Sequence, residues 1–275
     1  MTTHALPSQL LERVVQVDLV GCGGNGSQVL TGLARLDRAL RACGHPAGLH
    51  VIAWDPDRVT EANVGRQLFY PSDIGESKAV VLVHRLNLCY GLRWEAAPER
   101  YQGAAEMSVM GGWGRTRQAG DLLITCVDSA AARREIHAGI TEHTWGLNAT
   151  PRYWLDLGNR QTDGQVILGE PLCRNRPRPE SGRLPTVVEV FPELLDPKLR
   201  EDDRPSCSLA EALESQDLFV NQAVATWALQ LLWTLFRRGR IQHHGAFINL
   251  TTGQVAPLPV PAPVAEKRIR KRRAA

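Results

Sequence analysis

The sequence predicts an α/β fold built on a doubly wound, mainly parallel β-sheet. Two observations predict it. Apolar, β-branched runs of strand length alternate with amphipathic helical segments through the first half of the chain, and a glycine-rich turn joins the first run to the first helix. The 275 residues, 43% of them hydrophobic and 22% charged, can bury a full core, which excludes a disordered protein.

The first half of the chain supplies the parallel strands. Each strand run is rich in Val, Ile and Leu, and each helical segment carries apolar side chains at intervals of three and four residues. The expected strands are 14–20, 49–54 and 121–128, and the expected helices are 27–42, 76–90 and 130–143. This alternation is typical of Rossmann-like sheets.

The second half of the chain has a different pattern. In order, we expect an antiparallel hairpin over 153–169 with its turn at Thr162-Asp163-Gly164, a Pro- and Arg-rich loop over 170–205, a helix from a capping box at Ser208–Glu211 to Arg238, and a strand pair over 246–258. One apolar run inside the loop, 185–196, is either a partner-docking strand, a lid or a piece of core, and we favour core packing.

Cysteine spacing and the apolar stretches indicate a cytoplasmic chain without a membrane span. None of the six cysteines forms a CxxC pair, so we expect no zinc site. Companion metal ligands are also absent around His243 and His244, and we therefore expect these two residues at the surface. The most apolar stretch, 218–236, is interrupted by polar residues such as Asn221 and Gln230, which favours a buried helix. The first residues also lack the pattern of a secretory signal.

The net charge of +3 belongs to the C-terminal tail. Six of the 32 Lys and Arg residues lie within 267–273, and without the last ten residues the chain carries 26 basic and 28 acidic residues. Such a tail can bind a polyanion such as nucleic acid, or it can be a solvated terminus, which we favour.

A Gly21-x-Gly23-x-x-Gly26 motif lies between the first strand and the first helix. Glycines there permit a tight turn and a close backbone approach, and the helix N-terminus offers N–H groups to phosphate. The motif alone does not separate NAD, FAD and ATP, and it can also serve as a packing turn.

The residues after the second strand favour a triphosphate. Asp55 follows the strand, where a carboxylate can accept hydrogen bonds from ribose hydroxyls, and Asn63, Arg66 and Lys78 come next. A dehydrogenase binds pyrophosphate mainly through backbone amides, whereas a triphosphate site needs cations on its oxygens. Asp128, at the end of the third strand, is placed to hold Mg²⁺.

Together these motifs resemble the ThiF/MoeB/ubiquitin-activating-enzyme family of adenylating enzymes. The matching segments are GCGGNGS, DPDRVTEANVGRQ, GESKA and ITCVDS, and DLGNRQTDGQVILG resembles the hairpin that follows in the family. At finer grain, the C-terminal half resembles ThiF-family members of the PRTRC cassette, a plasmid-associated bacterial gene system.

The resemblance assigns roles to individual residues. It implies that Gly21, Gly23, Gly24 and Gly26 line the nucleotide, that Asp55 holds the ribose with Asp57 beside it, that Asn63, Arg66 and Lys78 meet the phosphates while Gln67 shapes their loop, and that Asp128 binds Mg²⁺. The implied reaction is ATP-dependent adenylation of the C-terminal carboxylate of a ubiquitin-like or ThiS/MoaD-like β-grasp partner, with release of pyrophosphate. The family also implies a homodimer.

With the family as a guide, the chain divides into four parts. They are a ThiF-type nucleotide-binding (adenylation) core over 1–170, a crossover loop over 171–205, a C-terminal helix and strand pair over 206–256, and a Pro-rich linker with the basic tail over 257–275.

The sequence departs from the family pattern at three points. The start of the chain has no clear match to the segment that lends an arginine across the dimer interface, and Arg13 is a weak candidate. The zinc-binding CxxC pairs are absent. The family's SNLNRQ segment reads ANVGRQ here (the NxxRQ segment), so Gly65 replaces the family's second Asn.

Two questions stay open on sequence alone. Cys207, just before a helix, is either a nucleophile for a thioester step or an unreactive loop thiol, and Cys173 is a weaker rival. A non-catalytic nucleotide-binding adaptor is an alternative function, and an NAD-dependent oxidoreductase is a less favoured one, because it would leave Arg66 and Lys78 without a role.

Overall fold

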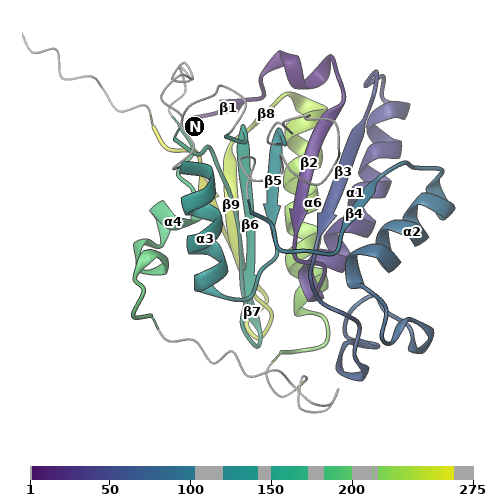
Figure 1. Ribbon diagram of the computed structural model, residues 1–275. Coiled ribbons are helices and arrows are strands. Elements are labelled where there is room, and N and C mark those ends of the chain that lie inside the picture. Colours follow the sequence, from purple (N-terminus) through teal and green to yellow (C-terminus); the bar gives the residue numbers. More distant parts are fainter. Residues whose placement is uncertain are drawn as a thin grey trace, which may run out of the picture.

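The computed structural model describes residues 2–102, 120–141, 150–172, 183–199, 213 and 216–262, and one large sheet forms its centre (Figure 1). Within these ranges the sheet has eight strands in the order β10-β9-β7-β6-β5-β2-β3-β4. Their bounds are β2 Val15–Val20, β3 Leu49–Trp54, β4 Glu95–Ala97, β5 Leu122–Thr125, β6 Tyr153–Asn159, β7 Asp163–Gly169, β9 His243–Asn249 and β10 Gln254–Pro259.

The sheet confirms the predicted mainly parallel, Rossmann-like architecture with antiparallel strands on one side. Strands β4, β3, β2, β5 and β6 are parallel, whereas the β6–β7, β7–β9 and β9–β10 pairs are antiparallel. Val20 pairs with both Trp54 and Thr125, so β2, β3 and β5 end together at one edge. The side chains that follow these strands therefore meet at that edge.

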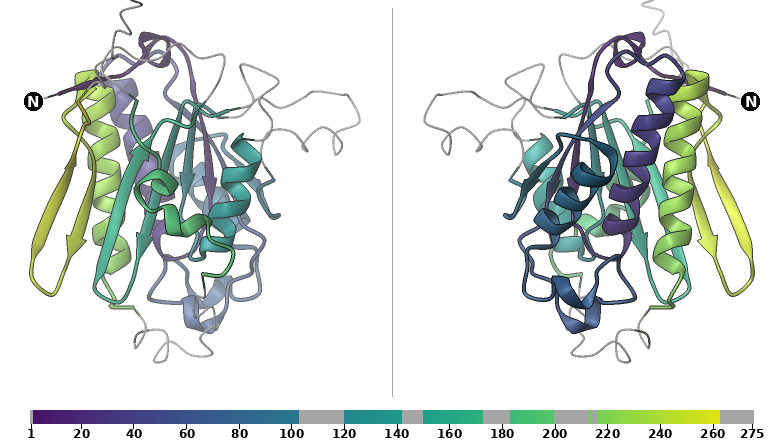
Figure 2. Two further views of the ribbon diagram at one scale, coloured as in Figure 1. Left: turned by 90° about the vertical axis from the view of Figure 1, so that its left-hand side faces the viewer. Right: turned by 90° about the vertical axis from the view of Figure 1, so that its right-hand side faces the viewer.

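Helices cover both faces of the sheet (Figure 2). Helices α1 (Gly24–Ala42), α2 (Lys78–Tyr90) and α6 (Val220–Arg238) share one apolar core with the sheet, and α3 (Ala130–Thr141) and α4 (Val187–Val190) contribute to the other. Short 3₁₀ helices lie at Ser8–Leu11, Glu61–Asn63, Pro71–Asp73 and Pro192–Leu195. Strands buried on both faces explain the nearly uninterrupted apolar runs of β2, β3 and β5.

The second half of the chain differs from the expectation in three respects. The last long helix begins at Val220, because 216–219 are not helical, and the expected capping box at 208–211 lies outside the described residues. The hairpin turn precedes Asp163, which is already the first residue of β7. The C-terminal strand pair extends the main sheet through the pairing of β9 with β7.

The apolar run at 185–196 packs into the core, as we favoured. It forms α4 and a 3₁₀ helix rather than a strand, and Val187 and Val188 are 1% and 2% exposed. Their neighbours in the second apolar core include Trp54, Leu123 and Ile136. Among the residues that the structure covers, no helix is long and apolar enough to cross a membrane.

A buried polar cluster fastens the N-terminal strand β1 (His4–Ala5), which pairs with β8 (Arg240–Ile241). His4 lies 2.7 Å from the Tyr153 hydroxyl and 3.7 Å from the carboxylate of Glu170. His244, expected at the surface, is buried here, and its Nδ1 lies 2.9 Å from the carbonyl oxygen of Leu168. Its place in the central sheet, one residue into β9, is the reason.

We predict that the cluster makes folding stability fall with acidity. Burial, together with the charge of Arg152, lowers the pKa of His4 from 6.5 to about 4, so the folded chain holds His4 neutral. The contribution of neutral His4 to folding stability is then fully present above the unfolded-state pKa of 6.5, and it is lost as the pH falls toward the folded-state pKa of about 4. One such group accounts for about 2 kcal/mol between pH 6.5 and about pH 5.

Urea unfolding of the wild type and of His4→Gln at about pH 7 and about pH 5 measures this effect. The wild type should lose more stability on acidification than His4→Gln does. His84→Gln, at an exposed position of α2, is the matched control and should behave like the wild type. Equal acid sensitivity of His4→Gln and the wild type would contradict the prediction.

Candidate functional site

A cleft of about 1190 Å³ opens where β2, β3 and β5 end. In a doubly wound sheet, this edge is where ligands bind. The residues proposed from sequence that line it are Gly21, Gly23, Gly24, Asp55, Asp57, Arg66, Gln67, Lys78 and Asp128. Gly26 and Asn63 are not part of its lining.

The glycine-rich turn is shaped by two close contacts. Gly21 has a φ of +89°, and a Cβ on it would lie 2.8 Å from the carbonyl oxygen of Cys126. A Cβ on Gly26 would lie 1.8 Å from the carbonyl oxygen of Gly21. Gly26 is thus needed for packing α1 against β2, while Gly23, whose Cβ would meet no atom nearer than 3.9 Å, faces open space in the cleft.

Asp55 is a buried carboxylate that also shapes the turn. One oxygen accepts a 2.6 Å hydrogen bond from the Cys22 amide, and the other accepts a 2.8 Å bond from the Asp57 amide. Burial raises the pKa of Asp55, and the charge of Lys78 and the two amide bonds oppose the rise. Each carboxylate oxygen has a second lone pair, so Asp55 can still accept a hydroxyl of a ligand.

Both cations proposed from the sequence, Arg66 and Lys78, line the cleft. Lys78 Nζ donates a 2.9 Å bond to Asp57, and its side chain is only 10% exposed. Arg66 Nη1 donates a 2.6 Å bond to Gln216, while its buried Nε has no hydrogen-bond partner in the structure. Burial lowers the pKa of Arg66, because desolvation disfavours the charged form. Their partial burial strengthens the attraction of both cations for an anion.

The two remaining residues of the NxxRQ segment have different surroundings. Asn63 Oδ1 accepts bonds from the Thr60 amide and hydroxyl, at 2.9 and 3.2 Å, so Asn63 closes the loop that carries Arg66. Gln67 is buried beside Gly23, and its Oε1 has no partner in the structure. Gln67 is thus directed at the cleft, whereas Asn63 acts on the loop.

Asp128 is exposed and follows β5, next to the start of α3. Within the described ranges, no three His, Cys, Asp or Glu side chains are grouped to hold a metal ion. Mg²⁺ does not need such a group, since it commonly binds one or two carboxylates together with substrate phosphates and water. The donor set of the cleft therefore fits Mg²⁺ delivered with a nucleotide.

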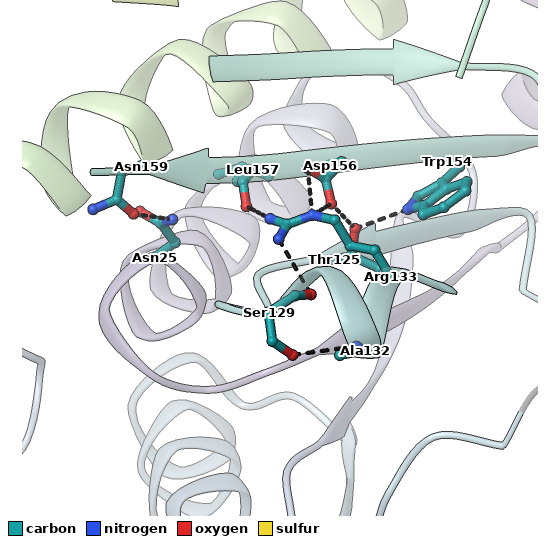
Figure 3. Close-up of polar contacts among 9 residues, drawn as sticks. All are labelled: Asn25, Thr125, Ser129, Ala132, Arg133, Trp154, Asp156, Leu157 and Asn159. Atoms are coloured by element: carbon teal, nitrogen blue, oxygen red, sulfur yellow. Dashed lines mark hydrogen bonds and ion pairs between the residues drawn. The ribbon is translucent and has the colours of Figure 1, made fainter. Parts of the chain in front are cut away.

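Sequence reasoning missed a buried ion-pair network that joins α3 to β5 and β6 (Figure 3). Arg133 Nε donates to both oxygens of Asp156 at 3.0 and 3.2 Å, and Nη2 donates to the Leu157 carbonyl at 3.1 Å. Thr125 donates to Asp156 at 2.6 Å and accepts from Trp154 at 2.8 Å. A charged residue inside the apolar strand YWLDLGN was the available signal, because a buried carboxylate needs a partner.

Several expected residues lie elsewhere. Arg13 pairs with Asp121 at 2.6 and 2.7 Å, just before β5 and so at the opposite edge of the sheet from the cleft of its own chain. Cys173, Cys207 and the basic tail at 267–273 lie outside the described residues. Cys22 is a buried thiol, and burial raises its pKa well above the usual value.

Comparisons with known proteins agree with this fold. The model of the ThiF family matches residues 7–266. One similar solved structure is selenomethionine PaaA, with 16% sequence identity and a TM-score of 0.54 over 90% of this chain and 64% of PaaA. Two others are MccB from E. coli crystallised with ATP and MccB crystallised with MccA, each with 13% identity and a TM-score of 0.54 over 91% of this chain. The match covers 64% of MccB in the ATP structure and 65% in the MccA structure. The chain thus spans less than two thirds of these proteins, and the likeness establishes the fold. No curated protein sequence matches the chain.

We predict that two glycine substitutions in the turn differ in their effect on folding stability. Gly26→Ala should cost about 2–3 kcal/mol of unfolding free energy, because its Cβ has no room against the Gly21 carbonyl. Gly23→Ala is the matched control and should stay within about 1 kcal/mol of the wild type, since its Cβ points into open space. Urea unfolding of both variants measures the difference, and equal stabilities would contradict the packing role of Gly26.

Proposed function

Because the chain belongs to the ThiF family, we propose that it uses ATP to adenylate the C-terminal carboxylate of a small β-grasp partner of the ubiquitin, ThiS or MoaD type. One observation carries the proposal: the glycine-rich turn, the cations Arg66 and Lys78, and Asp128 all line a single cleft at the edge where the parallel strands end. That is the set of groups a nucleoside triphosphate needs.

ATP would lie across the ends of β3, β2 and β5. Asp55 would accept a ribose hydroxyl, and the first amides of α1 would face the phosphates, since a helix start leaves its N–H groups without partners inside the helix. Arg66, with Nε unpaired, and Lys78 would bind phosphate oxygens. Asp57, already paired with Lys78, would keep that ammonium directed at the cleft.

In the proposed reaction, a carboxylate oxygen of the partner attacks the α-phosphorus of ATP. A bond forms between that oxygen and phosphorus, the bond from phosphorus to the bridging oxygen breaks, and pyrophosphate leaves with the bonding electrons. The product is a mixed anhydride of the partner and AMP. No general base is needed, because a C-terminal carboxyl group is ionised at neutral pH.

The residues of this chain act by position and charge. Arg66 and Lys78 stabilise the negative charge that grows on the phosphate oxygens, and their partial burial strengthens that interaction. Asp128 would hold Mg²⁺, which neutralises phosphate charge when bound. The Arg133–Asp156 ion pair keeps the start of α3, and with it Asp128, against β6.

Finer features of the proposal rest on sequence. The C-terminal half supports membership of the PRTRC group, and the family supports a homodimer and a cytoplasmic location. For residues 267–273 we still favour a solvated terminus over polyanion binding, and Cys207 stays open between a nucleophile for a thioester step and an unreactive loop thiol. The adaptor alternative differs in one respect that can be measured, since an adaptor would bind ATP without exchanging its pyrophosphate.

Isotope exchange between ATP and pyrophosphate tests the reaction. We expect exchange when the chain, Mg²⁺ and a synthetic peptide ending in a Gly-Gly carboxylate are present. The same peptide with an amidated C-terminus should support none. Arg66→Ala and Asp128→Ala should each lower the exchange rate by about 10²-fold or more, because each removes a group that stabilises the transition state.

The result that contradicts the enzyme is ATP binding without exchange for either peptide, which supports an adaptor. Gln222→Ala, at an exposed position of α6 away from the cleft lining, is the control variant and should exchange at the wild-type rate.

A further inference from the structure

The cleft extends beyond the residues assigned to ATP. Its second half lies over the β6–β7 hairpin and β9, and its walls include Asn25, Asn159, Phe191 and Phe247. The two phenylalanine rings meet edge to face, with centroids 6.0 Å apart. None of the proposed nucleotide contacts uses the side chains of these four residues.

Asn25, in this half of the cleft, has a side-chain atom without a hydrogen-bond partner. It is the second residue of α1 and is 7% exposed. Its Nδ2 donates a 2.8 Å bond to Asn159 Oδ1, and Figure 3 shows the two side chains facing each other. Its Oδ1 is buried and has no hydrogen-bond partner in the structure. Leaving a buried acceptor unpaired is costly, so this oxygen points to a ligand that carries a donor.

The amide of Asn25 is held in place from the side of β6. Asn159 ends that strand and pairs in register with Gly164 of β7, and its own Nδ2 donates to the Arg160 carbonyl at 3.2 Å. Two residues earlier, the Leu157 carbonyl accepts from Arg133. The unpaired oxygen is therefore presented by a rigid pair of amides rather than by a mobile side chain.

Sheet order separates this oxygen from the ribose site. Asp55 follows β3 and Asn159 ends β6, with β2 and β5 between them. At about 4.8 Å per strand, the two positions are roughly 14 Å apart along the sheet edge. A nucleotide whose ribose lies at Asp55 and whose phosphates lie at the glycine-rich turn leaves this half of the cleft to the molecule that supplies the carboxylate.

The chemistry of that molecule follows from the acceptor. A carboxylate offers no donor at neutral pH, but the peptide N–H nearest a polypeptide C-terminus does. We propose that Asn25, oriented by Asn159, accepts a hydrogen bond from the last peptide N–H of the acyl donor and so selects a polypeptide C-terminus over a simple carboxylic acid. The inference rests on the proposed function and names the part of the substrate that this site recognises.

A pair of probes isolates this hydrogen bond. One is a peptide ending in Gly-Gly with a free carboxylate, and the other is its ester analogue, in which glycolate replaces the last glycine and oxygen replaces the last N–H. Calorimetric titration into protein saturated with Mg²⁺ and α,β-methylene-ATP gives both affinities. The wild type should bind the amide about fivefold more tightly than the ester.

Asn25→Leu should bind the two probes equally, because it removes the acceptor, and Asn159→Ala should reduce the preference. Gln222→Leu, the same exchange of an amide for leucine on the exposed face of α6, is the matched control and should keep the wild-type preference. Thermal unfolding of each variant reports whether it is folded.

Three results would overturn the inference: equal binding of amide and ester by the wild type, no saturable binding of the amide probe, or a loss of nucleotide affinity in Asn25→Leu that exceeds its loss of affinity for the amide. The last would assign Asn25 to the nucleotide. Failure of the proposed function is seen separately, as absent nucleotide binding or as absent pyrophosphate exchange by a chain that binds both ligands.

Discussion

The close approach of Gly26 to the carbonyl oxygen of Gly21 is the contact on which the cleft depends. It lets α1 start directly at the end of β2, because no Cβ separates the helix from the turn. The start of α1 therefore lies at the edge where β3 and β5 also end. The Cys22 amide, within the same turn, binds Asp55 and so joins the turn to the next strand.

Around this turn, the cleft combines buried charge with unfilled hydrogen-bonding capacity. Arg66 Nε, Gln67 Oε1 and Asn25 Oδ1 are buried without partners in the structure, and burial lowers the pKa of Arg66. Leaving a buried polar group without a partner costs free energy, and hydrogen bonds to a bound ligand can offset that cost. The Arg133–Asp156 pair is different, since it is internally satisfied and holds α3 to β6. Within the cleft, the groups without partners are available to a ligand, and the satisfied Arg133–Asp156 pair holds one wall of the cleft in place.

The sequence predicts the parallel half of the fold well, because strands buried on both faces are continuous apolar runs and polar residues at their ends can be assigned to one edge. It predicts less where partners are distant in the chain. His244 looked exposed beside His243, but its environment comes from the pairing of β9 with β7. The role of Asn25 cannot be predicted from GCGGNG, because its hydrogen-bond partner, Asn159, lies 134 residues away in the chain. The start of α6 is not predictable from the sequence, because the non-helical turn at 216–219 has no proline or glycine to signal it.

Calorimetric titration with Mg²⁺·ATP, and separately with NAD⁺, shows whether the cleft is a triphosphate site. We predict saturable ATP binding that Arg66→Ala and Asp128→Ala both weaken, with no binding of NAD⁺. Tight NAD⁺ binding would contradict a triphosphate site and make the chain a candidate oxidoreductase. ATP binding that neither substitution weakens would also exclude a triphosphate site in this cleft, because it would place the phosphates away from Arg66 and Asp128.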